Sequence, residues 1–270
     1  MKASGALTTP SHSALKQALR PYWYRVLNAW RAAKSAAAGL AFDLFKRRAT
    51  IDGLVFEVPR AVTDLAFRSR FLFNSHERDE RTAVCQYLPA DCTVLELGAG
   101  LGVVSCVINS RLHNRARHVA VEANPHLIDT IHINRDRNGM QFGVEHCVVT
   151  ASGVGTFYLA PSISNSSRVD RGRAAITVPA ISLTQLESKY AMRFDALVCD
   201  IEGGEQEFFA DNPEFVARCR AVLIQFHPKL IGVGACDACR AALREGGLAL
   251  VGTFGTNEAW VRARFTPQRA

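Results

Sequence analysis

Short apolar runs alternate with amphipathic stretches along most of the chain. Strands are expected at 93–97, 118–122, 144–150, 156–159, 175–183, 194–200 and 221–226, and near 248–254 and 258–265. Helices are expected between them, at 76–88, 101–110, 125–138, 205–219 and 236–245. Regular strand–helix alternation with right-handed crossovers predicts an α/β fold with a doubly wound, mostly parallel sheet. A tight turn near 255–257 adds one antiparallel strand.

The first fifty residues follow a different pattern. Residues 1–13 are small and polar and are expected to be disordered, and a helix is expected from Pro21 to about Arg48. Its apolar positions recur at steps of three and four: Trp23, Val26, Leu27, Trp30, Ala33, Ala37, Leu40 and Leu44. Two interpretations stay open: residues 15–48 dock on a membrane surface or a partner, or the helix packs on its own domain. The predicted division is a basic helical arm, 1–50, and a domain at 51–270.

The net positive charge of the chain comes from this arm. The chain has a net charge of +7, yet residues 1–50 alone hold nine lysines and arginines against one acid, Asp43, so the rest is close to neutral. Enzymes that act on nucleic acid usually carry basic surface beside the active site, so this distribution disfavours a nucleic-acid partner.

Several features bear on the cellular compartment. The sequence has no apolar run of membrane-spanning length, and no apolar run follows Lys2 as in a secretory signal. The scattered cysteines are typical of reduced, buried thiols. The chain is therefore expected in the cytoplasm or on a membrane periphery, although the arm's few acids and many arginines are also typical of a transit peptide.

A glycine-rich turn follows the strand at 93–97. Gly98, Gly100 and Gly102 lie at alternate positions and lead into an apolar helix, an arrangement typical of a nucleotide-cofactor cradle. The spacing differs from the Gly-x-Gly-x-x-Gly of dinucleotide folds. Glu96 precedes the turn and would repel a pyrophosphate but suit a cationic ligand. Glu122, which ends the next strand, could bind a ribose diol in either class of enzyme.

Four segments together resemble a known family. Val-Leu-Glu-Leu-Gly-Ala-Gly-Leu-Gly resembles motif I of class I S-adenosylmethionine-dependent methyltransferases, and Val-Glu-Ala-Asn-Pro resembles their second motif. Phe-Asp-Ala-Leu-Val-Cys-Asp-Ile-Glu-Gly-Gly-Glu resembles the K-x-D-x-E-G-x-E signature of the FkbM methyltransferases, without its Lys, and Ile-Gln-Phe-His-Pro resembles their following strand. The resemblance covers about residues 85–260 and implies a Rossmann-like, seven-stranded methyltransferase fold with an N-terminal helical extension.

The resemblance also implies a cofactor, S-adenosylmethionine, and residues that hold it. Glu96 would order the turn and favour the cofactor's amino end, and Glu122 would bind the ribose hydroxyls. The other expected cofactor-binding residues are Gly98, Ala99, Gly100 and Gly102 under the methionine part, Ala123 and Asn124 beside the adenosine, His146 and Cys147 at the adenine, and Asp200.

Acidic residues gather where the strand at 194–200 ends. Asp200 and Glu202 are expected to be catalytic, because clustered carboxylates raise one another's pKa and could supply a base. No metal site is predicted, but Glu202 and Glu205 could hold a divalent cation if one is used, or they could simply cap the next helix. His227 is the second candidate base, or a structural hydrogen-bond donor. Arginines in the loop at 161–173 could contact the acceptor.

The sequence therefore favours an O-methyltransferase that acts on a hydroxyl of a small molecule or sugar. Two alternatives stay open. The basic arm could serve an RNA or protein methyltransferase, or the chain could be a non-catalytic S-adenosylmethionine-binding interaction protein.

Overall fold

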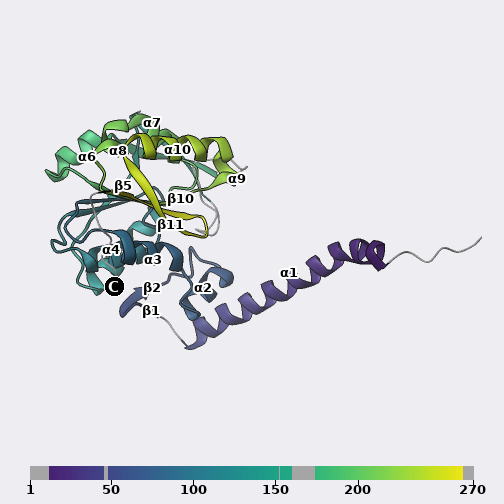
Figure 1. Cartoon of the computed structure of the whole chain (residues 1–270). Coiled ribbons are helices and arrows are strands. Elements are labelled where there is room, and N and C mark those ends of the chain that lie inside the picture. The colour runs from purple at the N-terminus through teal and green to yellow at the C-terminus, as the bar shows by residue number, and fades with distance from the viewer. Residues whose placement is uncertain (1–11, 46–47, 152, 160–173, 264–270) are drawn as a thin grey trace, which may run out of the picture.

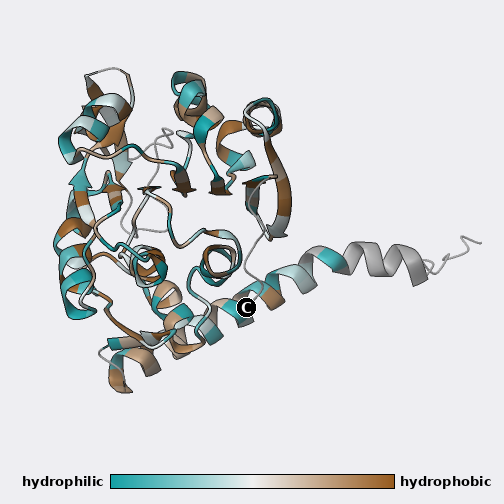
Figure 2. Ribbon diagram, turned by 60° about the vertical axis from the view of Figure 1, so that its left-hand side comes forward, coloured by the Kyte–Doolittle hydropathy of each residue, from teal (hydrophilic) through white to brown (hydrophobic). Residues whose placement is uncertain are grey.

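The computed structural model describes residues 12–45, 48–151, 153–159 and 174–263. Apolar strands form its interior, and amphipathic helices cover them, as Figure 2 shows by hydropathy. The main sheet has seven strands: β3 (Val94–Leu97), β4 (His118–Glu122), β5 (Gly143–His146), β9 (Ala196–Cys199), β10 (Ala221–Gln225), β11 (Leu248–Phe254) and β12 (Asn257–Arg262). Their order is β11-β12-β10-β9-β3-β4-β5. Six of these strands run in the same direction, and β12 runs in the opposite direction. The α/β, doubly wound, Rossmann-like fold expected from the sequence is confirmed.

Helices cover both faces of this sheet, α6, α7, α8 and α10 on one side and α3 and α4 on the other (Figure 1). The helices are α1 (His12–Phe45), α2 (Leu65–Leu72), α3 (Arg78–Tyr87), α4 (Val103–Arg111), α5 (Ile128–Arg137), α6 (Leu183–Tyr190), α7 (Glu205–Asp211), α8 (Pro213–Arg218), α9 (Pro228–Ile231) and α10 (Val233–Glu245). A 3-10 turn, Pro125–Leu127, opens α5. Leu95 and Leu97 pack toward Phe208 of α7, whereas Val94 packs toward α3 and α4.

Smaller sheets complete the fold. A hairpin precedes the main sheet in the chain, formed by β1 (Arg48–Ile51) and β2 (Leu54–Glu57). The strand predicted at 144–150 is divided, because β5 belongs to the main sheet while β6 (Val148–Val149) pairs with β8 (Ala174–Ile181). With β7 (Val154–Leu159), β6 and β8 form a second, three-stranded sheet.

Several helices differ from the prediction, which also lacked α2 and α9. The helix predicted at 205–219 is broken at Asn212, because Pro213 cannot continue α7 and instead begins α8. Helix α6 was missed, although a reciprocal capping box between Ser182 and Gln185 marks its start. Helix α1 begins at His12, earlier than Pro21. The loop at 161–173 lies outside the described residues.

The C-terminal part of α1 packs on α2. Ala38 and Phe42 are buried there, and Gly39 lies so close to α2 that a Cβ atom would overlap the carbonyl of Leu65. The rest of α1 projects away from the body of the molecule (Figure 1). Among the described residues, no helix is long and apolar enough to cross a membrane.

Candidate functional site

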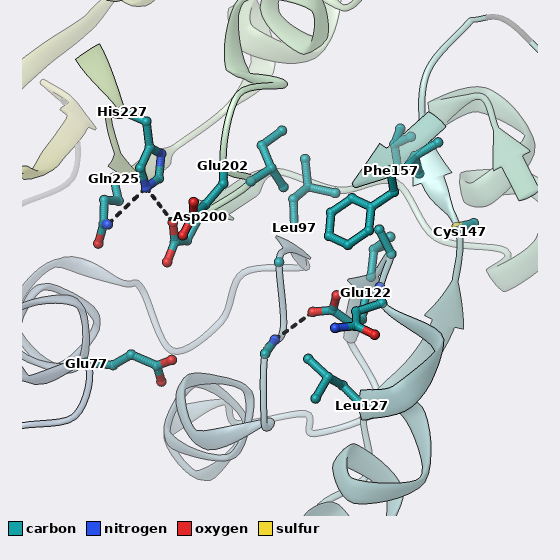
Figure 3. Close-up of a pocket in the computed structure, with 18 of the residues that line it drawn as sticks. Glu77, Leu97, Glu122, Leu127, Cys147, Phe157, Asp200, Glu202, Gln225 and His227 are labelled. Atoms are coloured by element: carbon teal, nitrogen blue, oxygen red, sulfur yellow. Dashed lines mark hydrogen bonds and ion pairs between the residues drawn. The ribbon is translucent and has the colours of Figure 1, made fainter. Parts of the chain in front are cut away.

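A cavity of about 420 Å³ lies at the carboxyl ends of the central strands β3, β4, β9 and β10 (Figure 3). In open α/β sheets this edge is the usual position of the ligand. The cavity is lined by residues of the glycine turn, of the four strand ends, of the second sheet and of α2, including Phe67, Arg70, His76, Glu77, Leu97, Gly98, Gly100, Glu122, Ala123, Asn124, Cys147, Phe157, Asp200, Glu202, Gln225 and His227.

The glycine turn is fixed by its neighbours in the sheet. The N–H of Gly98 donates to the carbonyl of Val121 (2.9 Å), and the N–H of Asp200 donates to the carbonyl of Leu97 (2.8 Å). Gly98 has a φ of +89°, and a Cβ there would overlap the carbonyl oxygen of Asp200. The turn therefore leaves backbone without side chains at the cavity wall, in a form that only glycine allows.

Glu122 connects this turn to the end of β4. Its Oε2 accepts from the N–H of Gly100 (2.8 Å), and its Oε1 accepts from the N–H of Asn124 (2.7 Å). Burial raises the pKa of Glu122 to about 7, even though these two backbone donors favour the charged form. A carboxylate fixed by two N–H groups keeps lone pairs for further hydroxyl donors on the cavity side.

His227 and Glu205 form a hydrogen-bonded pair beside Asp200. Nδ1 of His227 lies 2.6 Å from Oε1 of Glu205, whose side chain is fully buried and whose Oε2 accepts from the N–H of Gly203 (3.0 Å). Nε2 of His227 lies 3.4 Å from Oδ1 of Asp200 (Figure 3). The imidazole therefore stands between two carboxylates, one buried behind it and one in the cavity.

The pKa values of both cavity groups are shifted upward. Burial raises the pKa of Asp200 to about 7, against the opposing effect of His227, and Glu77, Glu202 and Glu205 add to the rise. Burial lowers the pKa of His227, but the hydrogen bond that His227 donates to Glu205 and the charges of Asp200, Glu205 and Glu202 outweigh it, so the pKa lies above its ordinary value. Titratable groups in a cavity whose pKa values are shifted by burial and by neighbouring charges are typical of sites that exchange protons in catalysis.

A family model described as the methyltransferase FkbM domain matches residues 96–246, more than half of the chain. The chain belongs to the FkbM methyltransferase family. It is an S-adenosylmethionine-dependent methyltransferase. No curated protein matches the chain.

Several solved structures are similar to this chain at low identity. The Pyrococcus abyssi tRNA (uracil-54, C5)-methyltransferase has a TM-score of 0.46 and 11% identity, over 79% of this chain and 44% of that one. The ribosomal protein L11 methylase of Lactobacillus delbrueckii has a TM-score of 0.42 and 12% identity, over 70% of this chain and 79% of that one. Aeropyrum pernix fibrillarin, with bound S-adenosylmethionine, has a TM-score of 0.38 and 14% identity, over 64% of this chain and 67% of that one. This chain thus spans less than half of the Pyrococcus protein.

The FkbM methyltransferase site fits its cofactor. The glycine turn forms a cradle that a Cβ at Gly98 would fill, and the Glu122 carboxylate is positioned by two backbone donors. Glu122, Asn124, Cys147 and Phe157 all line the same cavity. The carboxylates of Glu122 and Asp200 give this cavity a negative charge that suits a cationic ligand.

Some residues predicted from the sequence do not line the cavity. Glu96 points to the opposite face of the sheet, where its Oε2 contacts Nε2 of His118 at 3.0 Å. Glu205 lies behind His227. Both of its carboxylate oxygens already take part in hydrogen bonds, to His227 and Gly203, so Glu205 can orient the imidazole but does not face the cavity. Ala99, Gly102 and His146 also lie outside the lining. Among the described residues, no group of three or more histidines, cysteines or acids could hold a metal ion.

The structure adds a wall that the sequence did not predict. Phe67 and Arg70 of α2, with His76 and Glu77 after it, close the cavity from the side of the glycine turn. His76 is buried against the rings of Phe67 and Phe71. Glu77 has a φ of +48°, which is rare outside glycine, and such strain gathers at functional sites. The sequence pattern does not predict the left-handed conformation of Glu77.

Replacing Glu122 by glutamine is expected to weaken S-adenosylmethionine binding by about tenfold to a hundredfold, measured by calorimetry. The amide would turn an NH₂ group toward one of the two backbone donors, at Gly100 or Asn124, and would remove the negative charge. The matched control is Glu145→Gln, since Glu145 lies near the end of the neighbouring strand β5 but bonds to Tyr190 and Lys189. Equal affinity of the two variants would remove Glu122 from the cofactor site.

Proposed function

We propose that this FkbM methyltransferase transfers the methyl group to a hydroxyl oxygen of a small molecule or sugar. The observation that carries the proposal is the His227–Glu205 pair, which presents an imidazole nitrogen to the cavity beside Asp200. An unactivated hydroxyl needs a base when it attacks a methyl group, and a neutral imidazole is the commonest such base.

The partners of His227 support the required tautomer. Glu205 can only accept a hydrogen bond when it is ionised, so the proton of a neutral imidazole belongs on Nδ1. Nε2 then carries the lone pair, and the amide of Gln225 donates to it at 3.1 Å. Asn257 supports this orientation of the Gln225 amide by donating to its Oε1 at 3.3 Å. The basic nitrogen therefore lies on the cavity side, and an acceptor hydroxyl would replace the Gln225 donor.

The proton then has a defined destination. S-adenosylmethionine supplies the methyl group through its sulfonium and leaves as S-adenosylhomocysteine. As the oxygen–carbon bond forms, the acceptor loses its O–H bond and the proton moves to Nε2 of His227. Oδ1 of Asp200 accepts no hydrogen bond from the described residues and lies 3.4 Å from Nε2, so it is placed to receive the new N–H. Glu205 and Asp200 would together stabilise the imidazolium.

The charge of the cavity favours a neutral or cationic acceptor. Four carboxylates line it, at Glu77, Glu122, Asp200 and Glu202, and would repel the phosphates of a nucleic acid. Arg70 is the only arginine or lysine among the lining residues that the structure describes. The excess of positive over negative charge lies instead in the N-terminal arm.

The decisive experiment identifies the atom that is methylated. The purified chain would be given S-adenosylmethionine with an isotope-labelled methyl carbon, together with hydroxyl-bearing phenols and sugars, transfer RNA or total protein. Nuclear magnetic resonance separates O-methyl from N-methyl and C-methyl carbons by chemical shift. The expected product is an O-methyl ether of a small acceptor. Label that enters only RNA or protein would overturn the proposal in favour of the macromolecular alternative.

The rate of methyl transfer is expected to rise with pH through about 7 and then level off. The base works with His227 neutral and Asp200 ionised, and both states form on loss of a proton from groups whose pKa values are raised. Glu205→Gln should shift the rise toward lower pH, because it removes charge that raises the pKa of His227. A kcat profile measured for both proteins tests this, and a midpoint that Glu205→Gln leaves unchanged would contradict the pairing.

A further inference from the structure

An exposed apolar face runs along the projecting part of α1. Trp23 and Trp30 are 59% and 60% exposed, and seven residues separate them, so they lie on the same side of the helix, about 20° apart. Tyr22, Val26 and Leu27 continue this face in the projecting part, and Leu40, Leu44 and Phe45 are exposed further along, where the other side of the helix packs on α2. Monomeric proteins rarely expose a contiguous apolar surface of this kind unless something binds to it.

The contact with α2 uses another side of the same helix. Ala38, Gly39 and Phe42 face α2, and Phe42 lies 6.1 Å from Phe71, ring centre to ring centre. This packing fixes the end of α1 to the domain and leaves the tryptophan face free. Figure 1 shows the helix extending from that contact without a neighbour. The face therefore does not contribute to the described hydrophobic core.

Charge indicates which partner the face fits. The exposed cations of the projecting part are Arg20, Arg25, Arg31 and Lys34. The only acid of the first fifty residues, Asp43, is already bound, since Arg68 contacts it at 2.9 Å and Arg60 at 3.5 Å. The arm thus presents positive charge beside its apolar face. Nζ of Lys34 lies 5.3 Å from the centre of the Trp30 ring, so cation and aromatic belong to one surface.

We propose that this face of α1 binds an anionic lipid membrane, with the helix lying in the interface. Tryptophan and tyrosine are the side chains that concentrate at the boundary between headgroups and acyl chains, and lysine and arginine bind anionic headgroups. A second copy of the chain fits less well, because pairing two such helices would bring their cations together. RNA could bind the cations but would leave Val26, Leu40 and Leu44 in water.

The test uses the full-length chain and vesicles. Binding to phosphatidylcholine vesicles with and without phosphatidylglycerol is measured by flotation and by the blue shift of tryptophan fluorescence. Affinity for the anionic vesicles should be at least about tenfold higher and should fall as salt is added. Trp30→Ala should weaken binding by about tenfold. Tyr24→Ala is the matched control, since Tyr24 is 53% exposed but lies about 120° around the helix from Trp30, on the side away from Val26 and Leu44.

Because Tyr24 and Trp30 are exposed, neither substitution should alter the fold, and circular dichroism and S-adenosylmethionine affinity check this independently of methyl transfer. Equal binding to neutral and anionic vesicles would overturn the proposal, as would equal losses in Trp30→Ala and Tyr24→Ala. A dimer in sedimentation equilibrium that Trp30→Ala dissociates would assign the face to a second copy. Binding to RNA that Trp30→Ala weakens, without vesicle binding, would assign it to nucleic acid.

Discussion

His227→Ala is expected to lower kcat for methyl transfer by about a thousandfold while the affinity for S-adenosylmethionine stays within about twofold. The imidazole is the group that can take the acceptor's proton, and its removal takes away both the nitrogen that faces the cavity and the charge that lowers the pKa of Asp200, so Asp200 would hold its proton more tightly. The cofactor contacts expected at Glu122 and the glycine turn do not involve His227. Assays of methyl transfer measure kcat, and calorimetry measures the affinity for S-adenosylmethionine separately.

Two further variants make this result specific. His113→Ala removes an exposed histidine outside the cavity lining and should leave kcat unchanged. Asp200→Asn keeps the size of the side chain but loses the charge that stabilises an imidazolium, so a smaller loss, about tenfold to a hundredfold, is expected. If His227→Ala retained most of the wild-type kcat, His227 would be a structural hydrogen-bond donor, and the base would have to be sought at Asp200 or Glu202.

The sheet and the cofactor turn could be predicted because their signals are local. The run 94–97 is buried on both faces and apolar except for Glu96, as is typical of a parallel strand covered by helices on both sides, and the alternate glycines after it mark the turn directly. The end of β9 was found for the same reason, since Asp200 follows four buried apolar residues. Parallel strands place their carboxyl ends at one edge, so residues from separate strands could be brought together without coordinates.

The directions of side chains were harder to predict. Glu96 immediately precedes Leu97, and neighbouring residues in a strand point to opposite faces. Because Leu97 faces the cavity side, Glu96 points toward α3 and α4 and is paired with His118. Its acidity suggested a cofactor contact, but strand alternation places it on the other face. Glu205 also differs from the prediction, because it does not line the cavity and instead bonds to His227, which does.

The cavity wall at α2 could not be predicted because it depends on long-range packing. Arg70, His76 and Glu77 precede the first strand of the main sheet and have no motif of their own. Their position follows from Phe71, which packs against Phe42 of α1, and from Arg68, which binds Asp43. Contacts between residues so distant in the chain leave no periodic trace in the sequence.

Gly98→Ala is expected to lower the free energy of unfolding by about 3 kcal/mol or more and to abolish detectable S-adenosylmethionine binding. Two costs add. The φ of +89° is unfavourable for any residue with a Cβ, and this Cβ would overlap the carbonyl oxygen of Asp200. Relief of the overlap requires β3 and β9 to separate where the N–H of Asp200 donates to Leu97 (2.8 Å). Urea unfolding and calorimetry measure the two effects.

Gly139→Ala separates the two costs. Gly139 also has a positive φ, +62°, but no described atom lies within 4 Å of its Cβ position, so only the strain of about 1 kcal/mol is expected there. The difference between the two variants therefore measures the contact between the glycine turn and the end of β9. If both variants lost the same stability, the turn would have room to move away from Asp200. A large difference would mean that the cofactor turn and the catalytic carboxylate are held as one unit, since the glycine that opens the cradle also sets the position of Asp200.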